Sequence, residues 1–164
     1  MSSFDLYIPE YRKQLEKGTV KVAYQGLMKY FDSLRMHLKS SQPGYFISDI
    51  HYGLMDYTYL YFFPKELQRQ KLKVVILFSH DTFKFELLLA GYNREAQAKY
   101  WKQFKEKGFT KYQLSDNADE MDRFLSWTII DNADFSDLEA LTAQISKFTM
   151  EFIEEVERFL SKHK

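Results

Sequence analysis

Two histidines with neighbouring aspartates are the candidates for metal chemistry in this sequence. Asp49 and His51 lie in one strand-like run, and His80 and Asp81 lie at the end of another. If residues 45–90 form a meander, both pairs reach the same end of the sheet. Two imidazoles and two carboxylates are suitable ligands for zinc or a non-haem metal. The alternative is two polar hairpin ends that contain histidine.

A row of tyrosines is the second candidate site. Tyr57, Tyr59 and Tyr61 share one face of an expected strand, because side chains alternate along a strand. Their rings combine an apolar body with a polar tip, which suits the wall of a ligand pocket. Asp56 and Glu86 are strand carboxylates that could lie beside this wall and act as acid and base. We predict that the tyrosine face borders a pocket, against the alternatives of tyrosines at a core edge and of exposed strand acids.

Basic residues interleaved with aromatic ones form a third pattern, which could grip a nucleic-acid strand. At helical spacing, however, the aromatic residues form an apolar stripe and the lysines a solvated face. The chain has 23 basic and 23 acidic residues, whereas nucleic-acid binding generally uses a basic excess. We therefore do not expect nucleic acid as a partner. The pattern comprises Arg94, Lys99, Lys102, Lys105, Lys107 and Lys111 with Tyr100, Trp101 and Phe104.

Composition excludes several classes of site. The chain has no cysteine, which excludes disulfides, thiolate zinc sites, iron–sulfur clusters and a cysteine nucleophile. It contains no glycine-rich phosphate loop and no dinucleotide fingerprint, so we expect no cofactor. The first residues lack a signal-peptide pattern, and the apolar runs are too short for a membrane span. We therefore expect a cytoplasmic protein.

The elements that would position the candidate residues follow from periodicity and turn residues. Helices are expected over 9–17 and from Thr19 to Leu38, between Asn93 and Gly108, and from a capping box at Ser136–Glu139 to the chain end. Strands are expected over 45–52, 55–63, 72–80, 83–90, 109–114 and 123–130. The first four strands are joined by short links, which favour an antiparallel meander.

The length of 164 residues suits one domain. We therefore expect a single α+β domain over residues 1–164, with a mainly antiparallel sheet of four to six strands. N-terminal and C-terminal helices would pack against this sheet. The final helix is expected to be structural, with Phe148 and Phe152 in the core.

Four stretches carry a resemblance to known sequences. They are GLMDYTYLYFFP (53–64), KLKVVILFSH (71–80), LAGYNREAQAKYWKQFKEKG (89–108) and FSDLEALTAQISKF (135–148). They resemble an uncharacterised family of small single-domain bacterial proteins, a domain of unknown function. The resemblance implies a stand-alone bacterial protein and transfers no catalytic residue.

The passage FKFELLLAGYNREAQAKYWKQFKEKG (83–108) is also similar to part of the restriction-endonuclease-like fold. Those enzymes bind magnesium through an acidic residue followed by a Glu-x-Lys on an adjacent strand. Here Leu88 stands where the lysine would follow Glu86, and Lys84 precedes the glutamate instead. The nuclease motif is therefore incomplete.

Taken together, the patterns favour a ligand-binding or interaction module with an aromatic-lined site on the sheet. The alternative is a metal-dependent hydrolase or a diverged nuclease-like enzyme. The partner would be a small molecule or a protein, and the sequence is compatible with a homodimer.

Overall fold

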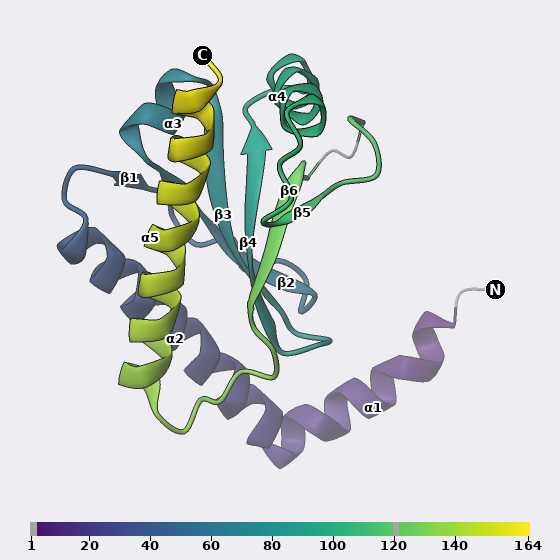
Figure 1. The fold of residues 1–164 in the computed structure, drawn as a ribbon. Coiled ribbons are helices and arrows are strands. Elements are labelled where there is room, and N and C mark those ends of the chain that lie inside the picture. Colours follow the sequence, from purple (N-terminus) through teal and green to yellow (C-terminus); the bar gives the residue numbers. More distant parts are fainter. Residues whose placement is uncertain (1–2, 120–121) are drawn as a thin grey trace.

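The computed structural model describes residues 3–119 and 122–164 and arranges them as helices around one antiparallel sheet (Figure 1). The helices of these ranges are α1 (Phe4–Lys17), α2 (Thr19–Ser41), α3 (Lys65–Arg69), α4 (Arg94–Glu106) and α5 (Leu138–Lys162). The strands are β1 (Phe46–Ile47), β2 (Tyr57–Phe63), β3 (Leu72–Ser79), β4 (Lys84–Gly91), β5 (Gln113–Leu114) and β6 (Leu125–Ile130). This architecture confirms the predicted α+β class.

The strand order is β1-β2-β3-β4-β6-β5, with every neighbouring pair antiparallel. The first four strands form the predicted meander. β1 is much shorter than expected, because Arg35 of α2 forms hydrogen bonds with the residues that follow this strand. The Arg35 Nε donates to the Ser48 carbonyl at 2.6 Å and its Nη2 pairs with Asp49 at 2.8 Å. Beyond this point only an isolated bridge, between His51 and Tyr59, continues the pairing with β2.

Strand register decides which residues share a face of the sheet. Leu60 of β2 is opposite Ile76 of β3, which is opposite Leu87 of β4. All three are buried, and they point to the face that α2 and α5 cover. The next residues along the strands, such as Tyr59 and Glu86, point to the other face because the side-chain period is two.

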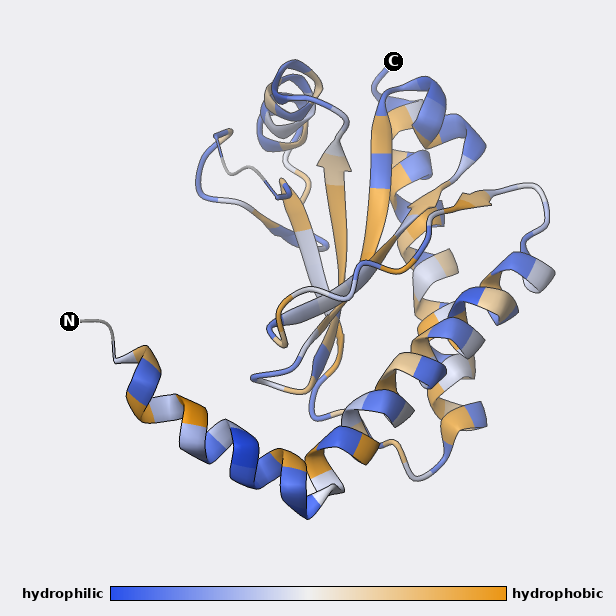
Figure 2. Ribbon diagram, turned by 180° about the vertical axis from the view of Figure 1, so that it is seen from behind, coloured by the Kyte–Doolittle hydropathy of each residue, from blue (hydrophilic) through white to orange (hydrophobic). Residues whose placement is uncertain are grey.

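The core lies between the sheet and the two helices α2 and α5, and the strands that form its floor are the most hydrophobic part of the ribbon in Figure 2. Phe62, Phe78 and Phe85 have no exposed surface in this layer. Leu34 of α2 and Phe152 of α5 close it from the helix side, and both are fully buried. The predicted cover by N-terminal and C-terminal helices is therefore provided by α2 and α5.

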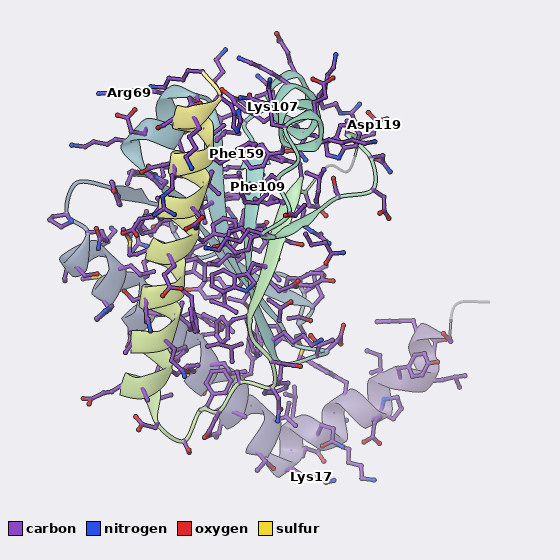
Figure 3. The ribbon with its side chains drawn as sticks, in the orientation of Figure 1. Lys17, Arg69, Lys107, Phe109, Asp119 and Phe159 are labelled. Carbon is purple, nitrogen blue, oxygen red and sulfur yellow. The ribbon has the colours of Figure 1, made fainter. Side chains whose placement is uncertain are left out.

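A second aromatic cluster fixes α4 at the end of the sheet. Phe104 of α4 lies 4.4 Å from Phe159 of α5 and 5.4 Å from Phe124, measured between ring centroids. Figure 3 shows Phe109 beside Phe159, where the rings are 4.9 Å apart. Because these contacts anchor the C-terminal part of α4, the position of its N-terminal turn relative to the sheet is set by packing.

The N-terminal cap of α4 agrees with the sequence pattern, and that of α5 differs from it. Asn93 caps α4 as predicted, since its side chain accepts a hydrogen bond from the Ala96 amide at 2.8 Å. The predicted capping box at Ser136 is wrong. Asp137 is the cap of α5 and accepts from the Ala140 amide at 3.1 Å, because the helix begins one residue later than the box requires.

The N-terminal helix α1 begins at Phe4, so Pro9 lies inside it rather than at its start. None of its residues is buried, and it extends away from the sheet (Figure 1). Gly18 separates α1 from α2 with a φ of 79°, a left-handed conformation that glycine adopts without strain. In the described ranges, no helix is long and apolar enough to cross a membrane.

Candidate functional site: a pocket on the second face of the sheet

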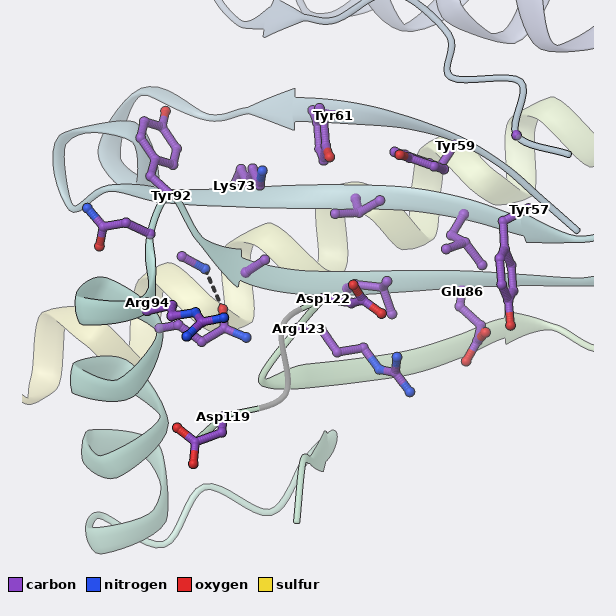
Figure 4. A pocket seen from close by; sticks show the side chains of 18 of the residues that line it. Tyr57, Tyr59, Tyr61, Lys73, Glu86, Tyr92, Arg94, Asp119, Asp122 and Arg123 are labelled. Carbon is purple, nitrogen blue, oxygen red and sulfur yellow. Dashed lines mark hydrogen bonds between the residues drawn. The ribbon is translucent and has the colours of Figure 1, made fainter. Parts of the chain in front are cut away.

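The face of the sheet turned away from α5 carries a pocket of about 790 Å³ (Figure 4). Its floor is the middle of β3 and β4, where the lining residues are apolar. Its walls come from β2, the N-terminal turn of α4 and the segment before β6. The floor consists of Val75, Leu77, Leu88 and Ala90. The pocket exists because α2 and α5 cover only one face of the sheet, while α4 stands at its end.

The tyrosines of β2 form one wall of this pocket. Tyr57 is 46% exposed, and Tyr59 and Tyr61 are half-buried. The rings of Tyr59 and Tyr61 meet edge to face at 5.7 Å. Burial raises the pKa of the Tyr61 hydroxyl, and the neighbouring Tyr59 and the Asp122 carboxylate raise it further. The wall is thus a run of phenol rings that face a partly wet space.

Lys73 projects from β3 into the same pocket and lies against the tyrosine wall. Its ammonium nitrogen is 4.0 Å from the centroid of the Tyr61 ring, a cation–π arrangement. Loss of water around the side chain lowers the pKa of Lys73, because burial disfavours the charged form. The site therefore holds a half-buried cation on a strand whose other residues from Leu72 to Phe78 are apolar.

The N-terminal turn of α4 closes one end of the pocket, and Gly91, Asn93, Arg94 and Gln97 line it there. Gln97 is 95% buried, with 5% of its surface exposed, and its side-chain oxygen accepts from the Gly91 amide at 2.8 Å. A Cβ at Gly91 would lie 2.5 Å from the backbone nitrogen of Gln97. Glycine is therefore required for β4 and α4 to approach this closely.

Acidic groups occupy other parts of the rim and floor. Glu86 comes from the middle of β4, and Asp119 and Asp122 come from the segment before β6. Asp56 lies in the turn before β2, where its Oδ1 accepts from the Leu54 and Tyr57 amides. These two hydrogen bonds lower the pKa of Asp56, so its carboxylate shapes the turn that presents Tyr57.

All five residues that the sequence offered as a ligand site line this one pocket, namely Tyr57, Tyr59, Tyr61, Asp56 and Glu86. Their role in binding stays a prediction. Sequence reasoning missed Lys73, although it is the one charge within the apolar run 72–79. It did not place Arg94 or Arg123 at this site, because only the tertiary arrangement brings α4 and the segment before β6 to this face.

The structure does not bring the four proposed metal ligands together. His51 stacks on Tyr59 with ring centroids 4.8 Å apart, while the His80 Nε2 lies 2.8 Å from the hydroxyl oxygen of Thr58. Tyr59 and Thr58 are adjacent on β2, so the two histidines lie on opposite faces of the sheet. Asp49 is paired with Arg35 instead.

Burial lowers the pKa of His80, and the charge of Asp81 acts at longer range to raise it. Among the residues that the structure describes, no group of three or more His, Asp or Glu side chains could hold a metal ion. The metal hypothesis and the hydrolase alternative that depends on it therefore receive no support from these positions.

The aromatic residues of the basic run point into the protein. Tyr100 and Phe104 are buried, and the Trp101 indole donates to the Ser115 carbonyl at 2.9 Å. These rings fasten α4 to the sheet and to the residue that follows β5. This packing agrees with the interpretation of the three aromatic residues as the apolar stripe of a helix.

The fold and the site together define an α+β protein in which one face of an antiparallel sheet is covered by helices and the other holds a small-molecule-sized pocket. The model of a domain of unknown function (DUF7000) matches residues 4–160, so the chain belongs to this family. The predicted resemblance to such a family is thereby confirmed. Neither a curated protein nor a solved structure matches the chain.

Proposed function

We propose that this protein binds a small organic molecule in the pocket beside β2. The observation that carries the proposal is the tyrosine wall: three tyrosines at alternate positions face a cavity of about 790 Å³. Sites for small organic ligands commonly have volumes of roughly 300–1,000 Å³, with apolar and aromatic walls and a few polar groups. An apolar floor with phenol tips and charged groups at the rim has this character.

The distribution of aromatic residues across the sheet supports a binding wall over a second core. The covered face uses phenylalanine, with Phe62, Phe78 and Phe85 fully buried. The pocket side of β2 uses tyrosine, whose hydroxyl needs a hydrogen-bond partner when water is removed. Tyr59 and Tyr61 keep part of their surface exposed, so their hydroxyls can exchange water for polar groups of a ligand.

A thermal-shift screen of small metabolites tests this proposal, with the variant Tyr59→Ala/Tyr61→Ala as the pocket knock-out. A ligand at about 100 times its Kd stabilises the folded state by about 2.7 kcal/mol. We expect such a shift in the wild type, its loss in the double variant, and its retention in Met36→Ala, which truncates an exposed side chain of α2. Equal shifts in all three proteins would contradict binding at this wall.

A second function, self-association, is favoured by α1. Its stripe of Tyr7, Ile8, Tyr11 and Leu15 follows helical spacing, and these side chains are between 38% and 67% exposed. A 14-residue helix without buried residues is marginal by itself, because isolated helices shorter than about 12–15 residues scarcely form in water. We propose that α1 packs against α1 of a second copy.

Charge along α1 favours an antiparallel pair. Asp5 and Glu10 lie in its first half, and Lys13 and Lys17 lie in its second half. Arg12 is paired within the helix, 2.9 Å from Glu16. An antiparallel arrangement therefore sets the acidic half of each helix beside the basic half of the other, and the helix dipoles oppose.

Single cysteines test the pairing cleanly because the natural chain has none. Tyr11 lies near the middle of α1, so Tyr11→Cys should form a disulfide-linked dimer under mild oxidation, whereas Lys17→Cys at the helix end should not. Sedimentation of the reduced wild-type protein should show a dimer that Tyr7→Asp/Tyr11→Asp converts to monomer. A wild-type monomer at high concentration would overturn the proposal, and equal crosslinking at both positions would indicate parallel helices.

A further inference from the structure

We infer that the ligand carries an anionic group, held by Lys73 at the α4 end of the pocket, while a planar part of the same molecule lies against Tyr59 and Tyr61. The inference rests on the proposed small-molecule function and specifies its chemical class. The ligand would be an aromatic or heteroaromatic carboxylate or phosphate ester.

The position of Lys73 is the first argument. It lies between Leu72 and Val74 on a central strand, and both neighbours have no exposed surface. Across the ladder its partner is Ala90 of β4, which is also buried. An apolar residue would pack on this sheet face without the loss of charge solvation that a lysine incurs. The presence of a lysine at this position is therefore explained by a bound partner for its charge rather than by a contribution to the stability of the sheet.

The surroundings of the ammonium group are the second argument. Its observed contact is the Tyr61 ring, which stabilises a cation only partly. Within residues 3–119 and 122–164, none of the ion pairs involves Lys73. Burial lowers the pKa of Lys73, and an anion bound beside it would favour the charged form. Binding an anion there is favourable because it pairs a desolvated cation.

The arrangement of charges along the pocket is the third argument. Lys73 and Arg94 lie toward the α4 end, whereas Glu86 and Tyr57 lie at the other end (Figure 4). Arg94 is the first residue of the 13-residue helix α4, whose N-terminus adds partial positive charge. Asp122 and Arg123 line the side between the two ends, and Asp119 lies at the rim beside α4 (Figure 4). A ligand with a single anionic group at the α4 end fits this polarity, because a second anion would approach Glu86.

The tyrosine wall supplies the rest of the recognition. The Tyr61 ring lies beside the ammonium group and meets Tyr59 edge to face, so a planar group attached to the anion would lie against these two rings. The pocket of about 790 Å³ accommodates such a molecule in one piece.

Two fluorescent probes of nearly the same shape test the inference. 1-Anilinonaphthalene-8-sulfonate carries one anionic group, and N-phenyl-1-naphthylamine has the same rings without it. We expect the wild-type protein to bind the sulfonate about tenfold more tightly than the neutral amine, a factor that corresponds to about 1.4 kcal/mol. Lys73→Met should remove this preference and leave the neutral probe unchanged. Lys73→Arg should keep it, and Lys99→Met, an exposed lysine on α4, should have no effect.

Competition and the pocket knock-out separate the outcomes. Benzoate and phenyl phosphate as competitors of the sulfonate probe tell a carboxylate site from a phosphate site. If neither probe responds to Tyr59→Ala/Tyr61→Ala, the pocket does not bind them and the proposed function fails. If both probes depend on the tyrosines but the sulfonate preference survives in a folded Lys73→Met protein, the anion inference alone is overturned.

Discussion

Gln97 and Gly91 join the first turn of α4 to the last residue of β4. The Gln97 Oε1 accepts from the Gly91 amide at 2.8 Å, and Gln97 is among the few buried polar side chains of the described residues. The pocket therefore depends on a hydrogen bond between its helix and its floor.

Gln97→Leu should destabilise the protein and displace the N-terminal turn of α4. A buried amide left without a partner lowers the free energy of unfolding by about 1–3 kcal/mol. Gln144→Leu, at an exposed position on α5, serves as the control and should change stability by less than about 0.5 kcal/mol. Urea unfolding of the two variants measures the difference, and equal midpoints would mean that this bond does not hold α4.

Phe152 and Phe148 on α5 should differ sharply when truncated, although the sequence predicts a core position for both. Phe152 has no exposed surface, whereas Phe148 is half-buried against Trp127 at 5.4 Å. Phe152→Ala should reduce the free energy of unfolding by about 3–5 kcal/mol because it leaves a cavity. Phe148→Ala should reduce it by about 1–2 kcal/mol. Similar losses in denaturant melts would contradict the observed packing of α5.

His80 should make the protein less stable as the pH falls. Burial lowers the pKa of His80 below its usual 6.5, although Asp56 and Asp81 oppose the shift. On acidification the unfolded chain takes up this proton before the folded chain does, so the free energy of unfolding decreases below about pH 6.5.

The measurement is a series of thermal melts between about pH 7.5 and 5 on the wild type and on His80→Gln. Glutamine can still bond the Thr58 hydroxyl that contacts His80, and it does not titrate. We expect a smaller decrease in Tm for the variant. Parallel pH profiles would show that another group causes the decrease.

Asp137 rather than Ser136 should carry the N-terminal stability of α5. Asp137→Ala removes the acceptor of the Ala140 amide and should lower the free energy of unfolding by about 0.5–2 kcal/mol. Ser136 precedes the cap and lies exposed, so Ser136→Ala should change it by less than about 0.5 kcal/mol. A larger loss at Ser136 in chemical denaturation would restore the capping-box interpretation.

The sequence by itself determined the local structure on which the site depends. The period of two in residues 57–61 places Tyr57, Tyr59 and Tyr61 on one face, whatever packs there. The short links between the four strand-like runs allow only antiparallel neighbours, so the meander follows from chain length. Asn93 defines the start of α4 because the cap acts within one helical turn.

Tertiary structure alone decided which face of the sheet is covered and what gathers on the other. Periodicity does not tell the face under α2 and α5 from the face with the pocket, because both strand faces carry large side chains. The opposite placement of His51 and His80 depends on register, since a shift of one residue exchanges the faces. Lys73 comes from β3, Arg94 from α4 and Arg123 from the segment before β6. They share the pocket only because long-range packing brings these three parts of the chain together, and no local pattern records that arrangement.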